Sequence, residues 1–258
     1  MCRRVKIKNK FIMKGSFKME EKLIDMKISG SGKISGGRYN EVKISGSAKV
    51  EGDIECYNYK CSGSSIASGN VKAETVGISG STKIMGDLDT DEISVSGSSS
   101  ILGNVDARKV KISGSTDIGG SLHTEDIQIS GSVSIDGDCE AENFHARGGF
   151  KIGGLLNAGN IDIEMYGSCK VKDIGGENIK VRLGRGHFFV KMLNLFMNNK
   201  GLEASTIEGD DIFLENTTAK IVRGNNVTIG DNCNIETVEY RNEINIDSTS
   251  KTVCKKID

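Results

Sequence analysis

Apolar and polar residues alternate in short runs along most of the chain, and the runs recur at intervals of about 17 residues. A Ser-Gly-Ser-like motif marks each repeat, and a second glycine follows six residues later. Alternation with a period of two is typical of strands with one buried face, and paired glycines indicate two tight bends per repeat. The first glycine, which we call the corner, is Gly30, Gly46, Gly63, Gly80, Gly97, Gly114, Gly131, Gly148 or Gly167.

Counted from each corner glycine, the apolar residues fall at fixed positions. Position four holds Val50, Ala67, Ile84, Ile101, Ile118, Ile135 and Ile152, and position thirteen holds Tyr59, Val76, Ile93, Val110, Ile127, Phe144 and Ile161. Positions eight and fifteen are also apolar, and position ten holds small residues from Cys56 to Ala158. One such coil cannot bury its apolar face alone, whereas coils stacked about 4.8 Å apart can. The sequence therefore predicts an all-β fold, a parallel β-helix with coils of about 17 residues.

Position seven forms a polar column, which reads Asp53, Asn70, Asp87, Asn104, Ser121 and Asp138. In this order no two carboxylates occupy adjacent coils, which avoids repulsion and lets the neutral side chains bond across. The preference of Asp and Asn for tight turns explains the same composition. The sequence leaves both interpretations open.

The pattern divides the chain into five segments. Residues 1–26 form a basic N-terminal arm, 27–183 the β-helix core, and 184–200 an apolar break or cap. Residues 201–247 are expected to form additional, less regular coils, because the same spacing returns in Ile212, Ile229 and Ile246, in Val227 and Ile244, and in Ile221 and Val238. Residues 248–258 are expected to form a C-terminal tail.

Composition supports a solenoid and points away from catalysis. The 258 residues include 33 Gly and no Pro, which suits a chain paired to its neighbours along its whole length. The seven cysteines lack a CxxC pair, so we interpret them as reduced thiols and place Cys56, Cys61 and Cys139 in the core. His123, His145 and His187 accompany no recognisable nucleophile, and no P-loop motif occurs. We therefore expect no enzyme, no catalytic residue, no cofactor and no metal.

Two other solenoid classes remain as alternatives. A left-handed hexapeptide β-helix acyltransferase has three hexapeptides in each coil, whereas here glycines recur at unequal intervals of six and eleven. A surface or adhesin-type solenoid would require export. No apolar run is long enough to cross a bilayer and no signal peptide is recognisable, so we expect a cytoplasmic protein.

The repeat itself, in stretches such as ISGSTKIMGDLDTDEISVSGSSSILGNV, resembles the bactofilins, polymer-forming bacterial cytoskeletal proteins. The resemblance covers about residues 28–183. It implies a right-handed triangular β-helix that assembles without nucleotide into non-polar filaments, often at the membrane, and supports cell-shape, envelope or motility machinery. Other bactofilins and such machinery would be its partners. The chain departs from the family in lacking Pro-rich flanks and in its longer C-terminal region, residues 184–258.

The open ends of a coil stack are expected to carry the contacts between subunits, since they expose unpaired backbone groups and apolar columns. At the N-terminal end the candidates are Leu23, Ile24, Met26, Ile28 and Ile34. At the far end they are Phe188, Phe189, Leu193 and Phe196, or Ile244 and Ile246 if the additional coils lie outermost. The apolar cluster within 186–200 is equally consistent with a cap on the main stack.

The N-terminal arm combines cations with apolar residues and has no acid before Glu20. Such a composition suits an anionic membrane surface, where each charge contributes about 1 kcal/mol. We expect no nucleic-acid binding, because the rest of the chain is acidic and shows no recognition fold. A start at Met13 or Met19 would remove much of the arm. The membrane-contact candidates are Arg3, Arg4, Lys6, Lys8, Lys10, Phe11, Ile12, Lys14, Phe17 and Lys18.

Overall fold

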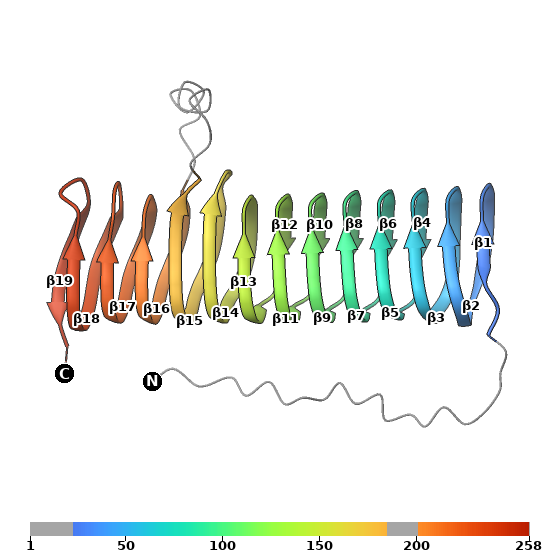
Figure 1. Cartoon of the computed structure of the whole chain (residues 1–258), viewed down its shortest axis with the longest axis horizontal. Helices are drawn as coiled ribbons and strands as arrows, with labels where there is room; N and C mark the ends of the chain where they lie inside the picture. The colour runs from blue at the N-terminus through green and yellow to red at the C-terminus, as the bar shows by residue number, and fades with distance from the viewer. Residues whose placement is uncertain (1–22, 185–200, 258) are drawn as a thin grey trace, which may run out of the picture.

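The chain folds into a straight rod (Figure 1). The computed structural model describes residues 23–184 and 201–257, and every regular element in these ranges is a β-strand. The strands pair in parallel within one continuous sheet that winds through about 13 turns, with coils about 17 residues apart. The predicted all-β parallel β-helix is therefore confirmed.

Each coil contributes one or two strands, depending on whether the backbone breaks at the second bend. The N-terminal coils comprise β1 (Met26–Ile28), β2 (Ser31–Ile44) and β3 (Ser47–Cys61). The regular middle alternates short and long strands: β4 (Ser64–Ala67), β5 (Val71–Ile78), β6 (Ser81–Ile84), β7 (Leu88–Val95), β8 (Ser98–Ile101), β9 (Val105–Ile112), β10 (Ser115–Ile118), β11 (Leu122–Ile129), β12 (Ser132–Ile135) and β13 (Cys139–Ala146). The last coils comprise β14 (Gly149–Met165), β15 (Cys169–Leu183), β16 (Leu202–Leu214), β17 (Thr217–Ile229), β18 (Asn234–Ile246) and β19 (Lys251–Lys256).

Parallel pairing stacks equivalent residues of successive coils directly on one another. Val76 pairs with Ile93, Ile93 with Val110, and Ile127 with Phe144. Position thirteen is no more than 2% exposed from Tyr59 to Ile161, and the other predicted apolar positions are buried as well. The columns therefore form a single continuous core along the rod.

The corner glycines are required by the closeness of successive coils. A Cβ atom on Gly63 would collide with the carbonyl oxygen of Gly46, and one on Gly97 with that of Gly80. Gly30 lies at the first described corner, and within the described residues no coil lies beneath it, so its Cβ would meet no atom within 4 Å. The repeat of glycine thus follows from stacking rather than from a special backbone angle.

The polar column at position seven is a hydrogen-bonded ladder. The Oδ1 atom of Asp53 accepts from the backbone N–H of Asn70 at 2.7 Å, and Asn70 accepts in the same way from Asp87 at 2.8 Å. The ladder continues to Asp138, which accepts from the N–H of Leu155 at 2.8 Å. The donor in each of these bonds is a backbone N–H, so any short side chain with an acceptor oxygen can make the bond. Asp, Asn and Ser are therefore interchangeable at this position.

The solenoid is continuous across the place where residues 185–200 are inserted. Strand β15 pairs directly with β16, with Cys169 opposite Leu202 and Ile179 opposite Ile212. The additional coils therefore lie outermost, which is the arrangement under which Ile244 and Ile246 were the expected end residues. Phe188, Phe189, Leu193 and Phe196 lie outside the described residues.

The first coil after the insertion is shorter than the sequence pattern predicts, whereas the next coil keeps the predicted spacing, with Val227 opposite Ile244 and Ile229 opposite Ile246. Ile212 pairs with Val227, so the predicted alignment of Ile212 with Ile229 is wrong. Ile221 pairs with Thr237, so its predicted alignment with Val238 is also wrong. In the coil of β16 each bend uses two residues where the regular coils use three, and Asn216 adopts a left-handed φ of 48° at one of them.

Residues 248–258, expected to form a tail, contain strand β19. It pairs in parallel with β18, through Thr237 opposite Val253 and Tyr240 opposite Lys256. The solenoid consequently ends in a partial coil.

Candidate assembly surfaces at the ends of the rod

At its N-terminal end the described solenoid stops in a partial coil, which covers only part of the next coil and so leaves a step. Strand β1 covers only Val42–Ile44 of β2. On the outer side of Ser31–Tyr39, no strand within residues 23–184 or 201–257 pairs with β2. Among the described residues, this end is therefore a long unpaired strand edge.

The predicted N-terminal candidates gather at this step. Met26 and Ile28 are partly buried and pack against the core, and Leu23 is also partly exposed. Ile24 is 60% exposed, whereas Ile34 is fully buried at 1%. Ile34 is thus a core residue of the first complete coil, and the other four form the accessible apolar surface.

The solenoid also stops in a partial coil at its C-terminal end. Strand β19 covers the first half of β18, from Asn234 to Tyr240. The outer edge of Arg241–Ile246 meets no strand in the described part of the chain. Ile244 and Ile246 pack against the core and remain partly exposed, and Val253 on β19 is 68% exposed. Backbone groups and apolar side chains are open together at both ends.

The sequence pattern did not indicate a role for two tyrosines at the ends of the rod. Position ten holds a small residue in the coils between, yet Tyr39 occupies it in β2 and Tyr240 in β18. Tyr39 is 8% exposed, and its hydroxyl donates to the carbonyl oxygen of Ser35 at 2.7 Å. Tyr240 packs against the core from the other end. A tyrosine ring fits at this position only where no further complete coil lies against it. The replacement of a small residue by tyrosine at position ten therefore marks both ends of the described rod.

The sides of the rod are mostly solvated and ion-paired. Side chains of opposite charge pair at position nine of successive coils. The Nε atom of Arg38 lies 3.4 Å from Oε2 of Glu55, and the Nζ atom of Lys72 lies 3.2 Å from Oδ2 of Asp89. The Nε atom of Arg223 lies 2.7 Å from Oε2 of Glu239. Exposed pairs of this kind contribute at most about 1 kcal/mol each. Exposed apolar side chains such as Ile66 occur on the sides too, but without an open strand edge.

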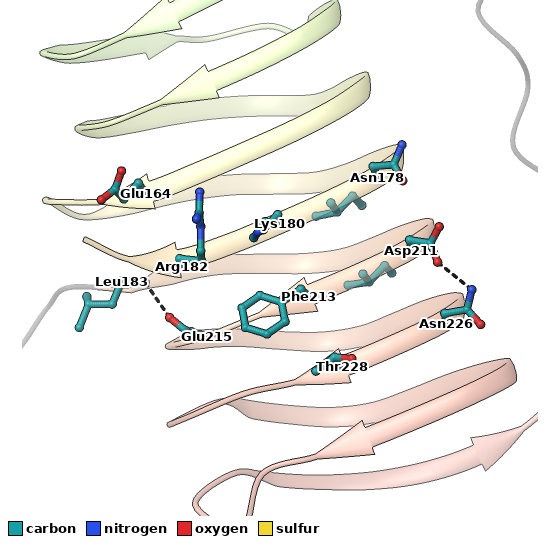
Figure 2. Close-up of a pocket in the computed structure, with 12 residues that line it drawn as sticks. Glu164, Asn178, Lys180, Arg182, Leu183, Asp211, Phe213, Glu215, Asn226 and Thr228 are labelled. Carbon is teal, nitrogen blue, oxygen red and sulfur yellow. Dashed lines mark hydrogen bonds between the residues drawn. The ribbon is translucent and has the colours of Figure 1, made fainter. Parts of the chain in front are cut away.

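A shallow groove lies beside the insertion, where β14 to β17 follow one another (Figure 2). Two hydrogen bonds join residues of its lining: the N–H of Leu183 donates to Glu215 at 3.1 Å, and Asn226 donates to Asp211 at 2.7 Å. The described residues that line it include no Ser, Cys or His. We assign the groove no chemistry.

Five of the cysteines in the described ranges are buried packing residues, and Cys254 is exposed. Cys56, Cys61 and Cys139 are 7%, 1% and 0% exposed, which confirms their predicted place in the core. Burial raises the pKa of the Cys56 and Cys139 thiols to about 12. Both thiols are therefore protonated at neutral pH, and a protonated thiol is neither a good nucleophile nor a metal ligand.

The described ranges hold neither a metal centre nor a membrane-spanning helix. No group of three or more His, Cys, Asp or Glu side chains there is placed to hold a metal ion. None of the described elements is a helix with the length and apolar character needed to cross a bilayer. The membrane-contact candidates, Arg3 through Lys18, lie outside the described residues.

Comparisons with known proteins agree with this architecture. The family model for bactofilins, described as polymer-forming cytoskeletal, matches residues 5–106. The chain is 57% identical over 231 residues to the uncharacterized protein YhbE of Bacillus subtilis (strain 168), covering 89% of this chain and 95% of that protein. It is 40% identical over 82 residues to the uncharacterized protein YhbF of the same organism, covering 31% and 32% of the two chains. No solved structure matches the chain.

Proposed function

Because the chain belongs to the bactofilin family of polymer-forming cytoskeletal proteins, we propose that it is a non-enzymatic scaffold whose subunits polymerise end to end without nucleotide. The observation that carries the proposal is that both ends of the described solenoid stop in a partial coil. Each end leaves strand edges unpaired and apolar columns partly exposed. In the cell, the polymer would support cell-shape, envelope or motility machinery.

Assembly at these ends repeats the interaction that holds the rod together. Inside the rod, every strand pairs with the coils on both sides and every apolar column is covered from both sides. A second subunit would supply the missing neighbour to Ile244 and Ile246, or to Met26 and Ile28. The driving force is the burial of apolar area, about 25 cal/mol per Å², together with backbone hydrogen bonds in an already ordered edge. No nucleotide is needed, since both partners are preformed.

The test is sedimentation of the purified chain at high speed with and without ATP or GTP. We expect the protein to pellet to the same extent in all cases, and electron microscopy of the pellet to show filaments. If light scattering gives the mass of a monomer at every protein concentration, the proposal is contradicted. Pelleting that requires a nucleotide would contradict its nucleotide independence.

The basic arm supports a second element of the proposal, attachment of the polymer to the cytoplasmic face of the membrane. A single arm, with seven cations before Met19, binds weakly, but many arms on one filament bind with high avidity. We expect the full chain to float with vesicles containing phosphatidylserine and not with neutral phosphatidylcholine vesicles. A chain beginning at Met19 should lose this flotation while still forming filaments. Equal flotation of both chains would rule out the arm as the anchor.

A further inference from the structure

We infer that the rod lies on an anionic membrane with one defined side towards the lipid, the side around the corner that carries the Ser-Gly-Ser motif. The inference rests on the membrane attachment proposed above and adds the orientation of the rod. We call this side the basic edge. It comprises the corner serines and the rows of side chains at positions fourteen and three, on either side of them. Because the rod is straight, both rows run along its length (Figure 1).

The row at position fourteen is rich in exposed lysine. Strand pairing stacks three of these lysines in succession, Lys27 on Lys43 and Lys43 on Lys60. The Nζ atoms of Lys27 and Lys60 lie 4.0 Å and 3.1 Å from the carboxylate of Glu41. Between residues 27 and 180 the acid in this row is Asp162. The lysines of the row are Lys27, Lys43, Lys60, Lys111 and Lys180, and all are exposed.

Position three repeats this pattern on the other side of the corner. Lys33 stacks on Lys49, and Lys151 stacks on Lys170. From Lys33 to Lys170 the acid in this row is Asp117. Lysines therefore flank the serine corner on both sides. Those of this row are Lys33, Lys49, Lys83, Lys151 and Lys170, and all are exposed.

The fold does not require these lysines. Like charges on neighbouring strands repel one another, and other coils place Ser94, Ser100 or Gln128 at the same positions. An external surface of negative charge would convert this repulsion into attraction. The basic edge is therefore suited to contact with an anionic partner.

The charges of the rod are sorted between its corners. Position eleven, at a different corner from the serines, holds Glu74, Asp91, Glu125 and Glu142, interrupted by Arg108. An anionic surface attracts the basic edge and repels the corner at position eleven. Such a charge distribution turns one side of the rod towards the surface.

Exposed apolar side chains beside the lysines favour a lipid surface over a nucleic acid. Ile66 lies in the row at position three between Lys49 and Lys83, and it is 49% exposed. Met85 and Leu102 are exposed on the same face at position five. Membrane interfaces bind surfaces that combine cations with apolar side chains. Sites for single-stranded nucleic acid use aromatic side chains and Arg instead, and neither row contains Phe, Tyr, Trp or Arg between residues 27 and 180.

The basic edge orients the rod, and the N-terminal arm anchors it. The rod is acidic apart from this edge, so the edge alone is a weak anchor. Once the arm holds the rod at the surface, each lysine that reaches the headgroups strengthens binding about fivefold. Repetition of the edge along a filament multiplies the effect.

Fluorescent labels on two corners test the orientation. We would label S94C, in the lysine row at position fourteen, and separately E74C, at position eleven, since both side chains are exposed. Both chains would carry C2S and C254S, because Cys56, Cys61, Cys139, Cys169 and Cys233 are buried. Vesicles would contain phosphatidylserine, phosphatidylcholine and a quencher on the lipid headgroups. We expect the S94C label to lose its fluorescence on binding and the E74C label to keep it.

Other results of this experiment would contradict the inference. Equal quenching of the two labels would overturn the orientation while leaving membrane attachment in place. Failure of the full chain to float with these vesicles would contradict both the attachment and the orientation. A response of the S94C label to RNA but not to vesicles would assign the edge to nucleic acid. A response to filament assembly alone, with no further change when vesicles are added, would assign it to contacts between filaments.

A pair of charge variants tests the same edge by affinity. K83Q/K111Q removes one lysine from each row, and we expect the affinity of the full chain for these vesicles to fall more than about tenfold. The matched control, K72Q/K109Q, removes two cations from positions nine and twelve. Its affinity should change by less than about twofold, because these positions lie away from the membrane. Equal losses in the two variants would show that only net charge matters and would overturn the inference.

Discussion

Replacing Gly97 with alanine should destabilise the middle of the rod by about 3 kcal/mol, the upper range for overpacking a close-packed site. The added Cβ would lie 2.5 Å from the carbonyl oxygen of Ser79 and would collide with that of Gly80. Both contacts are backbone, so no side chain can rotate away. The coils on either side must separate, which weakens strand pairing at the corner.

The matched control is Gly30→Ala, since a Cβ at Gly30 meets nothing within 4 Å. Its effect should stay within about 0.5 kcal/mol. Amide hydrogen exchange followed by mass spectrometry would report the change locally, in peptides covering residues 79–101. Equal protection of these peptides in G97A and in the parent chain would contradict the steric explanation of the corner glycines.

Replacing Ile246 with glutamate should abolish sedimentable polymer while leaving the rod folded. Ile246 lies on the open edge of β18 and packs against the core from the end. In any contact through this end its neighbour would be another subunit, and burying a carboxylate without a partner there is strongly unfavourable. We expect the concentration needed for assembly to rise at least about 100-fold, equivalent to about 2.8 kcal/mol.

The control is Ile66→Glu, which adds the same charge on the side of the rod, where Ile66 is 49% exposed. It should pellet as the parent does. Circular dichroism and hydrogen exchange would establish that I246E keeps its strands up to β17. If I246E forms filaments at the parent's concentration, the C-terminal end is not an assembly surface; if I66E fails as well, the contacts extend along the side.

The sequence predicted the middle of the rod because each residue there is repeated in its neighbours. Val76, Ile93 and Val110 recur at the constant spacing of the repeat and prove to be stacked and buried. The polar column was also visible, although only the structure shows that its oxygens bind the backbone of the next coil rather than a neighbouring side chain. Periodicity identifies columns well, but it does not specify which group a polar side chain binds.

Prediction was poorer where the repeat loses its constant length. The coil from Ile212 to Val227 is shorter than the regular coils because both of its bends are shortened, and Asn216 replaces a corner glycine. A fixed spacing then aligns Ile212 with the wrong residue, although it aligns Ile229 correctly with Ile246. The ends were harder still, since β19 has no coil beyond it and carries a charge-rich sequence. Tyr39 and Tyr240 looked like exceptions to a column, and only their places in the first and last complete coils explain them.

The middle coils are equal in length, and this equality limits which insertions and deletions the rod can accept in evolution. Because β5, β7, β9 and β11 pair at one constant offset, a duplication or loss of one whole coil joins equivalent backbone positions and leaves both terminal steps intact. A change of any other length shifts the glycines out of line and sets a Cβ against a carbonyl oxygen. Relatives of this chain should therefore differ in length by whole coils within this region, so that the spacing of subunits along a filament varies in increments of about 4.8 Å.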